Sequence, residues 1–226
     1  NYIANGIEGD LDIPVATERK SSVQSKYDKI ASYYDVWDAV PERFYYRAWR
    51  RQLWSKVTAG KILEIGVGTG KNMHFYPPGA QVTGVDFSSG MLEKAALRAA
   101  DRRDVNIELV QVDVNNLPFE VAQFDAVVGS FILMVVPDPL KTLQEVKRIC
   151  KPGGKLLLLE FNRSRNRVKA FFQKLFTYLT RAVYCAHINR DIVGLVERSG
   201  FQIIRVDEMA GDVAKIIEAS YSYQEQ

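Results

Sequence analysis

The sequence is poor in the residues that build disulfide frameworks and cysteine metal clusters. It has two cysteines, Cys150 and Cys185, and two histidines among its 226 residues. Such frameworks and clusters need several cysteines at defined spacings. We therefore expect neither, predict no metal site, and take the low cysteine content as compatible with a reducing cytoplasm.

Long apolar runs and a strong charge imbalance are also missing. The sequence contains no run of about 18 apolar residues, so it predicts no transmembrane helix. The formal net charge of +3 is small, and the basic residues concentrate in two segments without a known reader motif, so we expect no nucleic-acid partner. Residues 1–24 are polar and predict a flexible segment, whereas 25–226 predicts one domain.

From residue 61 onward, short apolar runs alternate with helical stretches. The runs that predict strands are 61–65, 81–86, 106–113, 124–130, 155–161, 201–209 and 213–220, and the helices between them are 88–102, 138–150 and 190–199. Strands separated by helices favour parallel pairing, whereas the last two are close enough for an antiparallel hairpin. The pattern predicts an α/β fold: a Rossmann-like, seven-stranded, mostly parallel sheet with its last strand antiparallel and helices on both faces.

Two helical segments lie outside this alternation. Residues 25–58 predict a helical lid, with Pro41 as an internal break. Residues 162–188 predict a helical insertion between the fifth and sixth strands.

The stretch ILEIGVGTGKN, residues 62–72, has the glycine content of a ligand-binding loop. A phosphate loop needs four residues between its first glycine and the Gly-Lys pair, followed by Ser or Thr. Here three residues intervene, and Asn72 replaces the hydroxyl. A dinucleotide loop needs a small third residue, which neither possible starting glycine provides. A turn that needs glycine only for its shape stays open as an alternative.

An acidic residue followed by alternating glycines, Glu64 and then Gly66, Gly68 and Gly70, resembles the cofactor loop of class I S-adenosylmethionine-dependent methyltransferases. The resemblance implies S-adenosylmethionine as cofactor and S-adenosylhomocysteine as product. It further implies that Asp86 accepts the ribose hydroxyls and Asp113 binds the adenine amino group. The alternatives are that Asp86 only caps the following helix and that Asp113 is an ordinary surface residue of its loop. The implied cofactor residues are Tyr27, Glu64, Gly66, Gly68, Gly70, Asn72, Asp86, Phe87, Met91, Asp113, Val114 and Ser130.

Other stretches resemble one branch of this family. YDKIASYYD at 27–35 and LEF at 159–161 are similar to motifs of quinone-biosynthesis and phospholipid N-methyltransferases, and FYPPGAQVTGVDFSSGML at 75–92 is closer to the phosphatidylethanolamine enzymes. The candidate catalytic residues are Tyr34, His187 and Glu160. An in-line methyl transfer depends mostly on positioning, so a general base is required only for some acceptors.

The predicted insertion combines an apolar helical face with positive charge. Val168, Phe171, Phe172, Leu175, Leu179, Ala182 and Val183 share one face, and the stretch 163–183 carries basic but no acidic residues. Such a helix favours an anionic membrane surface, which implies a protein peripheral to the inner face of a membrane. A helix that simply covers the active site, with solvated basic residues, is the alternative.

The sequence therefore predicts a methyltransferase for an amphiphilic or lipid-linked acceptor, with a phosphatidylethanolamine-type amine favoured over a quinone precursor. The alternatives are a soluble methyltransferase for small thiols or amines and a cofactor-binding module without catalysis.

Overall fold

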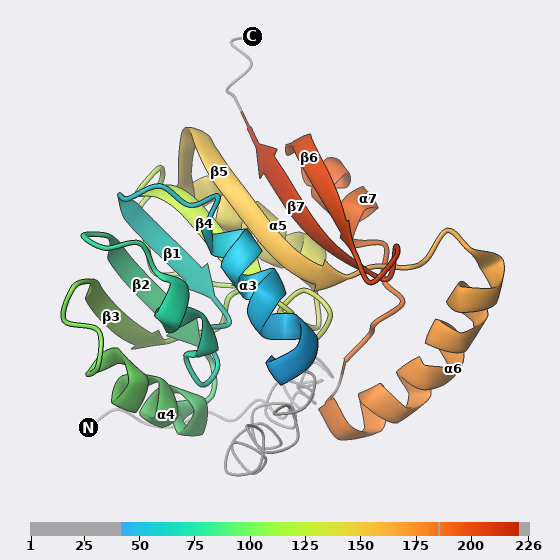
Figure 1. Ribbon diagram of the computed structural model, residues 1–226. Helices are drawn as coiled ribbons and strands as arrows, with labels where there is room; N and C mark the ends of the chain where they lie inside the picture. Colours follow the sequence, from blue (N-terminus) through green and yellow to red (C-terminus); the bar gives the residue numbers. More distant parts are fainter. Residues whose placement is uncertain (1–41, 185, 222–226) are drawn as a thin grey trace, which may run out of the picture.

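The computed structural model describes residues 42–184 and 186–221 (Figure 1). The predicted flexible segment 1–24, the first part of the predicted lid, Tyr27 and Tyr34 lie outside the described residues. The division into a lid, one domain and an insertion stays a prediction.

A seven-stranded sheet forms the centre of the described chain, as the alternation predicted. Its strands are β1 (Lys61–Ile65), β2 (Gln81–Asp86), β3 (Asn106–Gln111), β4 (Phe124–Ser130), β5 (Cys150–Phe161), β6 (Gln202–Met209) and β7 (Ala214–Ser220). Their spatial order is β3-β2-β1-β4-β5-β7-β6, and β7 pairs antiparallel with both β5 and β6. Because β1 lies between β2 and β4, the chain reverses its direction of winding beside β1, which is where open α/β sheets bind ligands.

The predicted bounds of four strands differ from the structure: β6 and β7 each begin one residue later than predicted, and β5 and β3 differ by more. β5 begins at Cys150 rather than 155, because Cys150 pairs with Phe124 before the register shifts and pairing resumes between Lys155 and Ala126. β3 ends at Gln111, so Asp113 lies in the turn that follows rather than on the strand.

Helices cover both faces of the sheet. α3 (Arg47–Trp54), the short helix η2 (Lys71–Phe75) and α4 (Ser89–Ala99) pack on one face, and α5 (Pro139–Ile149) and α7 (Ile192–Arg198) pack on the other (Figure 1). Successive residues of β1 show the division: Ile62 joins the core under α3, whereas Leu63 joins the core under α5. Burial of both strand faces explains why these strands are continuously apolar.

The two predicted helical additions are described in part. A single π-helical turn, η1 (Glu42–Tyr46), leads into α3, which ends at Trp54, short of the predicted boundary at 58. α6 (Arg167–Tyr184) follows β5 and extends away from the sheet (Figure 1). In the described part of the chain, no helix is both long and apolar enough to cross a membrane.

Candidate functional site

A small cavity opens at the carboxyl ends of β1, β2 and β4. Its enclosed volume is about 70 Å³, within a cleft open to solvent, so a larger ligand would extend past the mouth. Its walls are Arg50, Gly66, Val67, Gly68, Thr69, Lys71, Asp86, Phe87, Met91, Ser130, Phe131, Ile132 and Val135. Six of the predicted cofactor residues therefore surround one space: Gly66, Gly68, Asp86, Phe87, Met91 and Ser130. Their contact with a cofactor stays a prediction.

The glycines of the loop after β1 are required for two different reasons. All three have left-handed backbones, with φ of 66° at Gly66, 55° at Gly68 and 83° at Gly70. A Cβ at Gly66 would lie 2.7 Å from Ile132 Cδ1, so packing within the protein also excludes a side chain there. A Cβ at Gly68 would meet no protein atom within 4 Å, because this residue faces the cavity. The bare backbone at Gly68 thus leaves room for a ligand.

Asp86 joins the end of β2 to this loop. Its Oδ2 accepts the Gly68 N–H at 2.9 Å, and its Oδ1 accepts the Ser88 N–H at 3.0 Å. Ser88 in turn accepts the Met91 N–H and so caps α4. Asp86 also lines the cavity, and a carboxylate can accept up to about four hydrogen bonds, so its contact with ribose hydroxyls stays a prediction.

Glu64 lies behind the cavity instead of on its surface. One of its oxygens accepts a hydrogen bond from the Tyr76 hydroxyl, and the other accepts Asn72 Nδ2 at 2.6 Å. Asn72 also donates to Ser130 Oγ at 3.1 Å and accepts from Arg50 Nη1 at 3.0 Å. This buried network connects α3, β1, η2 and β4, so Glu64 and Asn72 orient the loop from beneath.

The burial of Glu64 changes its proton affinity. Desolvation raises its pKa from 4.5 to about 7, although the hydrogen bonds from Tyr76 and Asn72 and the charge of Arg50 act in the opposite direction. Burial and the neighbouring carboxylate raise the pKa of Tyr76 well above its ordinary range. Burial therefore favours the protonated forms of Glu64 and Tyr76, which lie in a poorly solvated position next to the cofactor loop.

Phe131, on the wall of the cavity, belongs to an aromatic cluster. Phe131 stacks on Phe161 with ring centroids 5.3 Å apart, and Tyr46 lies 5.0 Å from Phe131. The Arg50 guanidinium lies 5.4 Å from the Phe131 centroid, within cation–π range. Phe131 has φ of 57°, which is a costly conformation for a bulky residue and commonly occurs at functional sites.

Glu160, a predicted catalytic residue, is fully buried at the end of β5 and does not line the cavity. Its Oε1 accepts the backbone N–H groups of Ile132 at 2.8 Å and Leu133 at 2.7 Å. Burial is the main reason that its pKa rises to about 8. In the described structure Oε2 has no hydrogen-bond partner. Glu160 therefore supports the loop that follows β4, and this placement does not favour the predicted contact with substrate.

The remaining predicted site residues lie away from the cavity. Asp113 accepts the Asn115 N–H at 2.9 Å and so holds its own turn, and the neighbouring Val114 is part of the core between the sheet and α5. His187 is half-buried, and its backbone N–H bonds Met134 O at 2.8 Å, but the residue is absent from the cavity wall. A catalytic role for His187 stays untested.

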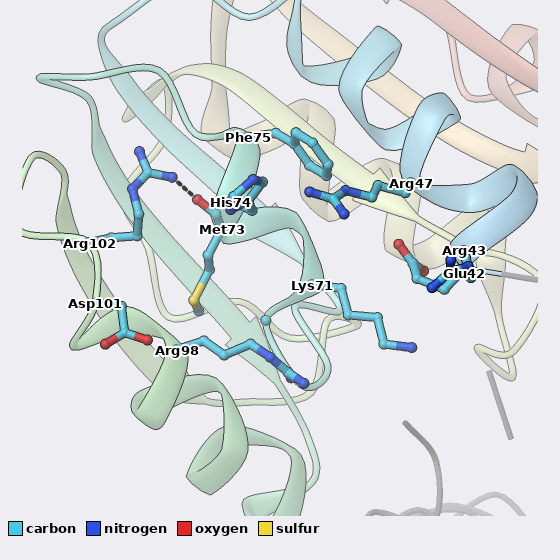
Figure 2. A pocket seen from close by; sticks show the side chains of 11 residues that line it. Glu42, Arg43, Arg47, Lys71, Met73, His74, Phe75, Arg98, Asp101 and Arg102 are labelled. Carbon is cyan, nitrogen blue, oxygen red and sulfur yellow. Dashed lines mark hydrogen bonds between the residues drawn. The ribbon is translucent and has the colours of Figure 1, made fainter. Parts of the chain in front are cut away.

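A larger cavity of about 960 Å³ borders the cofactor cavity at Lys71 and Gly70. Figure 2 shows it between η1, the start of α3, η2 and the end of α4, with the side chains of Arg43, Arg47, Arg98 and Arg102 around it. Arg98 donates to Thr69 O, and Arg102 donates to Met73 O and, at 2.9 Å, to Tyr76 O. These arginines hold the glycine loop and η2 from outside. We place the cofactor in the smaller cavity, because that cavity contains Gly68 and Asp86.

Seven residues of the cavity wall were not predicted from the sequence, among them Arg50 and Phe131. Arg50 is buried together with Leu53 and Trp54, at the i, i+3, i+4 spacing of one helix face. An arginine on the same face of an amphipathic helix as Leu53 and Trp54 is a signal that the sequence does contain. For Phe131, the sequence offers only its place directly after a strand, because its left-handed backbone depends on tertiary packing.

A parallel sheet with this reversal point, a loop of left-handed glycines and an acid at the end of the next strand defines the class of α/β proteins that bind a nucleoside-containing cofactor. The open space at Gly68 and the carboxylate of Asp86 on the cavity wall fit S-adenosylmethionine. The ligand has no phosphate, which agrees with the absence of a complete phosphate-loop motif.

Comparisons with known proteins narrow the class. Residues 63–158 match the model of the methyltransferase domain family. The demethylmenaquinone methyltransferase of Paenarthrobacter aurescens (strain TC1) is 35% identical over 74% of this chain, and that of Mycobacterium sp. (strain JLS) is 31% identical over 86% of this chain and 91% of its own length. The phosphatidylethanolamine N-methyltransferase of Cereibacter sphaeroides is 37% identical over 49% of this chain and 56% of its own.

A solved structure agrees on the fold. The Thermotoga maritima S-adenosylmethionine-dependent methyltransferase described as a possible histamine N-methyltransferase superposes with a TM-score of 0.69 over 88% of this chain and 99% of its own, at 20% identity. The chain spans 64% of the length of the Paenarthrobacter relative. The chain belongs to the class I S-adenosylmethionine-dependent methyltransferases, in the branch that includes the quinone-biosynthesis and phosphatidylethanolamine enzymes.

Proposed function

We propose that this chain catalyses transfer of a methyl group from S-adenosylmethionine to a ring carbon of an amphiphilic quinol. The sequence favoured a phosphatidylethanolamine-type amine, but that preference has no support. The demethylmenaquinone methyltransferases match 74% and 86% of the chain, whereas the phosphatidylethanolamine enzyme matches 49%.

The placement of Arg50 beside Phe131 is the observation that carries the proposal. Phe131 on the cavity wall, held by its contacts with Phe161 and Tyr46, offers a flat surface against which a quinol ring can stack. The guanidinium of Arg50 lies over Phe131 and also pairs with Glu42 at 3.2 Å, so an ammonium acceptor would find this cation–π position already occupied. An ionised ring oxygen next to Arg50 would be stabilised instead.

The transfer needs an electron-rich ring carbon and a dry approach. S-adenosylmethionine, when bound, would supply an electrophilic methyl group to the ring carbon and would leave as S-adenosylhomocysteine with the sulfur electron pair, while the ring carbon would release its proton to solvent. Arg50 would stabilise the ring-oxygen anion that activates the carbon, and the stack of Phe131 and Phe161 would exclude water from one side.

A labelled-methyl assay tests the acceptor. The protein is given a demethylated quinol in micelles, phosphatidylethanolamine vesicles, and a panel of small thiols and amines. We expect label on the quinol ring. Label on the lipid amine, or on a small thiol or amine, would overturn the proposed acceptor. If S-adenosylhomocysteine binds but no acceptor is labelled, a binding module without catalysis replaces the proposal.

Arg50→Gln tests the role of the guanidinium. Since one charge-assisted interaction contributes about 1.5 kcal/mol or more, we expect kcat with the quinol to fall at least about tenfold. Arg47→Gln is the matched control, because Arg47 is exposed on the same helix and does not line the cofactor cavity. If both variants retain wild-type kcat, Arg50 does not stabilise the reacting ring.

A further inference from the structure

The first half of α6 has its polar side toward the protein and its apolar side toward solvent. Gln173 and Thr177 are buried, and Gln173 accepts the Ser164 N–H at 2.8 Å and donates to Asn162 O at 2.9 Å. Phe171 and Phe172 are 65% and 61% exposed, and Val168 and Leu175 are comparably exposed. A helix that merely covered the sheet would be oriented the opposite way.

The exposed apolar residues of α6 form a group. They lie within the two turns from Val168 to Leu175, whereas Leu97 on α4 and Ile204 on β6 are single exposed residues of other elements. Phe44 and Tyr45 form a smaller exposed pair on η1. Single exposed apolar residues are normal on soluble proteins, but contiguous groups indicate a binding surface.

Positive charge surrounds this group. A cavity of about 270 Å³ at the start of α6 is lined by Arg163, Ser164, Arg165, Arg167, Ala170, Phe171 and Lys174, with no acidic residue among them. The acids at the base of the helix are already occupied, because Glu208 pairs with Arg165, and Asp212 pairs with Lys169 at 3.6 Å. Within the described residues, Arg163, Arg167 and Lys174 have no ion-pair partner, so the surface has a net positive charge.

Asp212 fixes the orientation of this surface. It accepts hydrogen bonds from the Ser164 hydroxyl and, at 2.8 Å, from the Arg165 N–H, which tie the start of α6 to the turn between β6 and β7. These bonds lower the pKa of Asp212 to about 2, so the attachment persists across the physiological range. The helix is therefore held outward at its base, and Figure 1 shows it extending beyond the body of the sheet.

We propose that α6 docks on the headgroup layer of an anionic phospholipid bilayer. Phe171 and Phe172 enter the boundary between headgroups and acyl chains, and the cavity lined by Arg163, Arg167 and Lys174 takes a lipid phosphate. Charge complementarity favours a bilayer with anionic lipids, and the adjacent aromatic residues add apolar burial that a soluble anion would not provide. Docking of this kind is independent of the chemistry of the acceptor.

Co-sedimentation with vesicles tests the proposal. We expect the protein to sediment with vesicles rich in phosphatidylglycerol and to be released from them by high salt. With pure phosphatidylcholine vesicles it should stay in the supernatant. Arg163→Gln with Arg167→Gln should lower the partition coefficient about 30-fold, since each basic residue near the surface contributes roughly fivefold. Phe171→Ser with Phe172→Ser should lower it at least about tenfold.

Matched control variants distinguish binding through this surface from nonspecific adsorption to vesicles. Leu97→Ser removes a side chain that is 75% exposed on α4, and Arg103→Gln removes an exposed charge beyond α4. Both should retain wild-type partitioning. All substituted side chains are exposed, so unfolding midpoints should stay unchanged. Equal binding to both vesicle types, or equal losses in the control variants, would overturn the proposal. A dimer that the Phe171→Ser, Phe172→Ser variant abolishes would assign the surface to a second copy of the chain.

Discussion

Replacement of Asp86 by asparagine measures how this acid holds the cofactor loop. Each carboxylate oxygen accepts one backbone N–H, from Gly68 or from Ser88, at 2.9–3.0 Å. Asparagine has the same shape but offers one acceptor and one donor, so one of the two backbone groups loses its bond. A hydrogen bond to a charged group contributes about 1.5–3 kcal/mol, which predicts a rise of roughly 10- to 150-fold in the Kd for S-adenosylhomocysteine.

Calorimetric titration of the wild type and of Asp86→Asn gives this ratio. Asp138→Asn is the control, because Asp138 caps α5 on the other face of the sheet and asparagine caps helices equally well. An unchanged Kd for Asp86→Asn, with the control also unchanged, would refute the view that Asp86 positions the loop for the cofactor.

The same titrations separate loop support from ribose contact. An analogue without the two ribose hydroxyls should bind the wild type more weakly than S-adenosylhomocysteine does. If Asp86 also accepts those hydroxyls, their removal should weaken binding much less in Asp86→Asn than in the wild type. The thermodynamic cycle should then give a coupling energy of about 0.5–3 kcal/mol. Equal losses in both proteins would show that the ribose does not touch Asp86.

Three further outcomes follow from buried or constrained residues. Burial raises the pKa of Glu160 to about 8, so as the pH rises the unfolded chain loses the Glu160 proton before the folded chain does. Between the unfolded and folded pKa values, the free energy of unfolding therefore falls by about 1.4 kcal/mol per pH unit. Glu160→Gln removes this decline, so its stability in urea titrations should rise relative to wild type from pH 5 to about 8; parallel curves would contradict the raised pKa. Gly66→Ala should lower the Tm more than Gly79→Ala, since both glycines have positive φ but only the Cβ at Gly66 would meet a side chain, at 2.7 Å; equal shifts would refute this packing argument. Gln173→Ala leaves two buried backbone groups without partners, at about 1–3 kcal/mol each, and should speed proteolysis within α6; unchanged cleavage would show that this residue does not hold the helix.

The sequence predicts the strands that are buried on both faces. Residues 61–65, 81–86 and 124–130 form β1, β2 and β4 with the predicted bounds, because continuous apolar runs between helices leave few alternatives. The start of β5 was wrong because the pairing of Cys150 with Phe124 is a tertiary contact across a proline- and glycine-rich bend. Local pattern contains no information about such a partner.

The candidate site shows a similar limit. Spacing identified Gly68 and Asp86, but it did not show that Glu64 faces Tyr76 and Asn72 rather than the cavity. For α6, periodicity correctly placed Phe171 and Phe172 on the apolar face of an amphipathic helix, yet it could not show which face meets the protein. That choice depends on the hydrogen-bonding partners of Gln173, which come from elsewhere in the chain.

Arg98 and Arg102 donate hydrogen bonds to backbone carbonyls of the glycine loop and of the η2 segment. These bonds affect how the site opens. α4 begins just after Asp86 and ends near these arginines, so the helix and the loop are joined at both ends. The two segments should then exchange their amide hydrogens as one cooperative unit. A cofactor that contacts only the loop would slow exchange along α4 as well, and fraying of the last turn of α4 would weaken cofactor retention without altering any contacting residue.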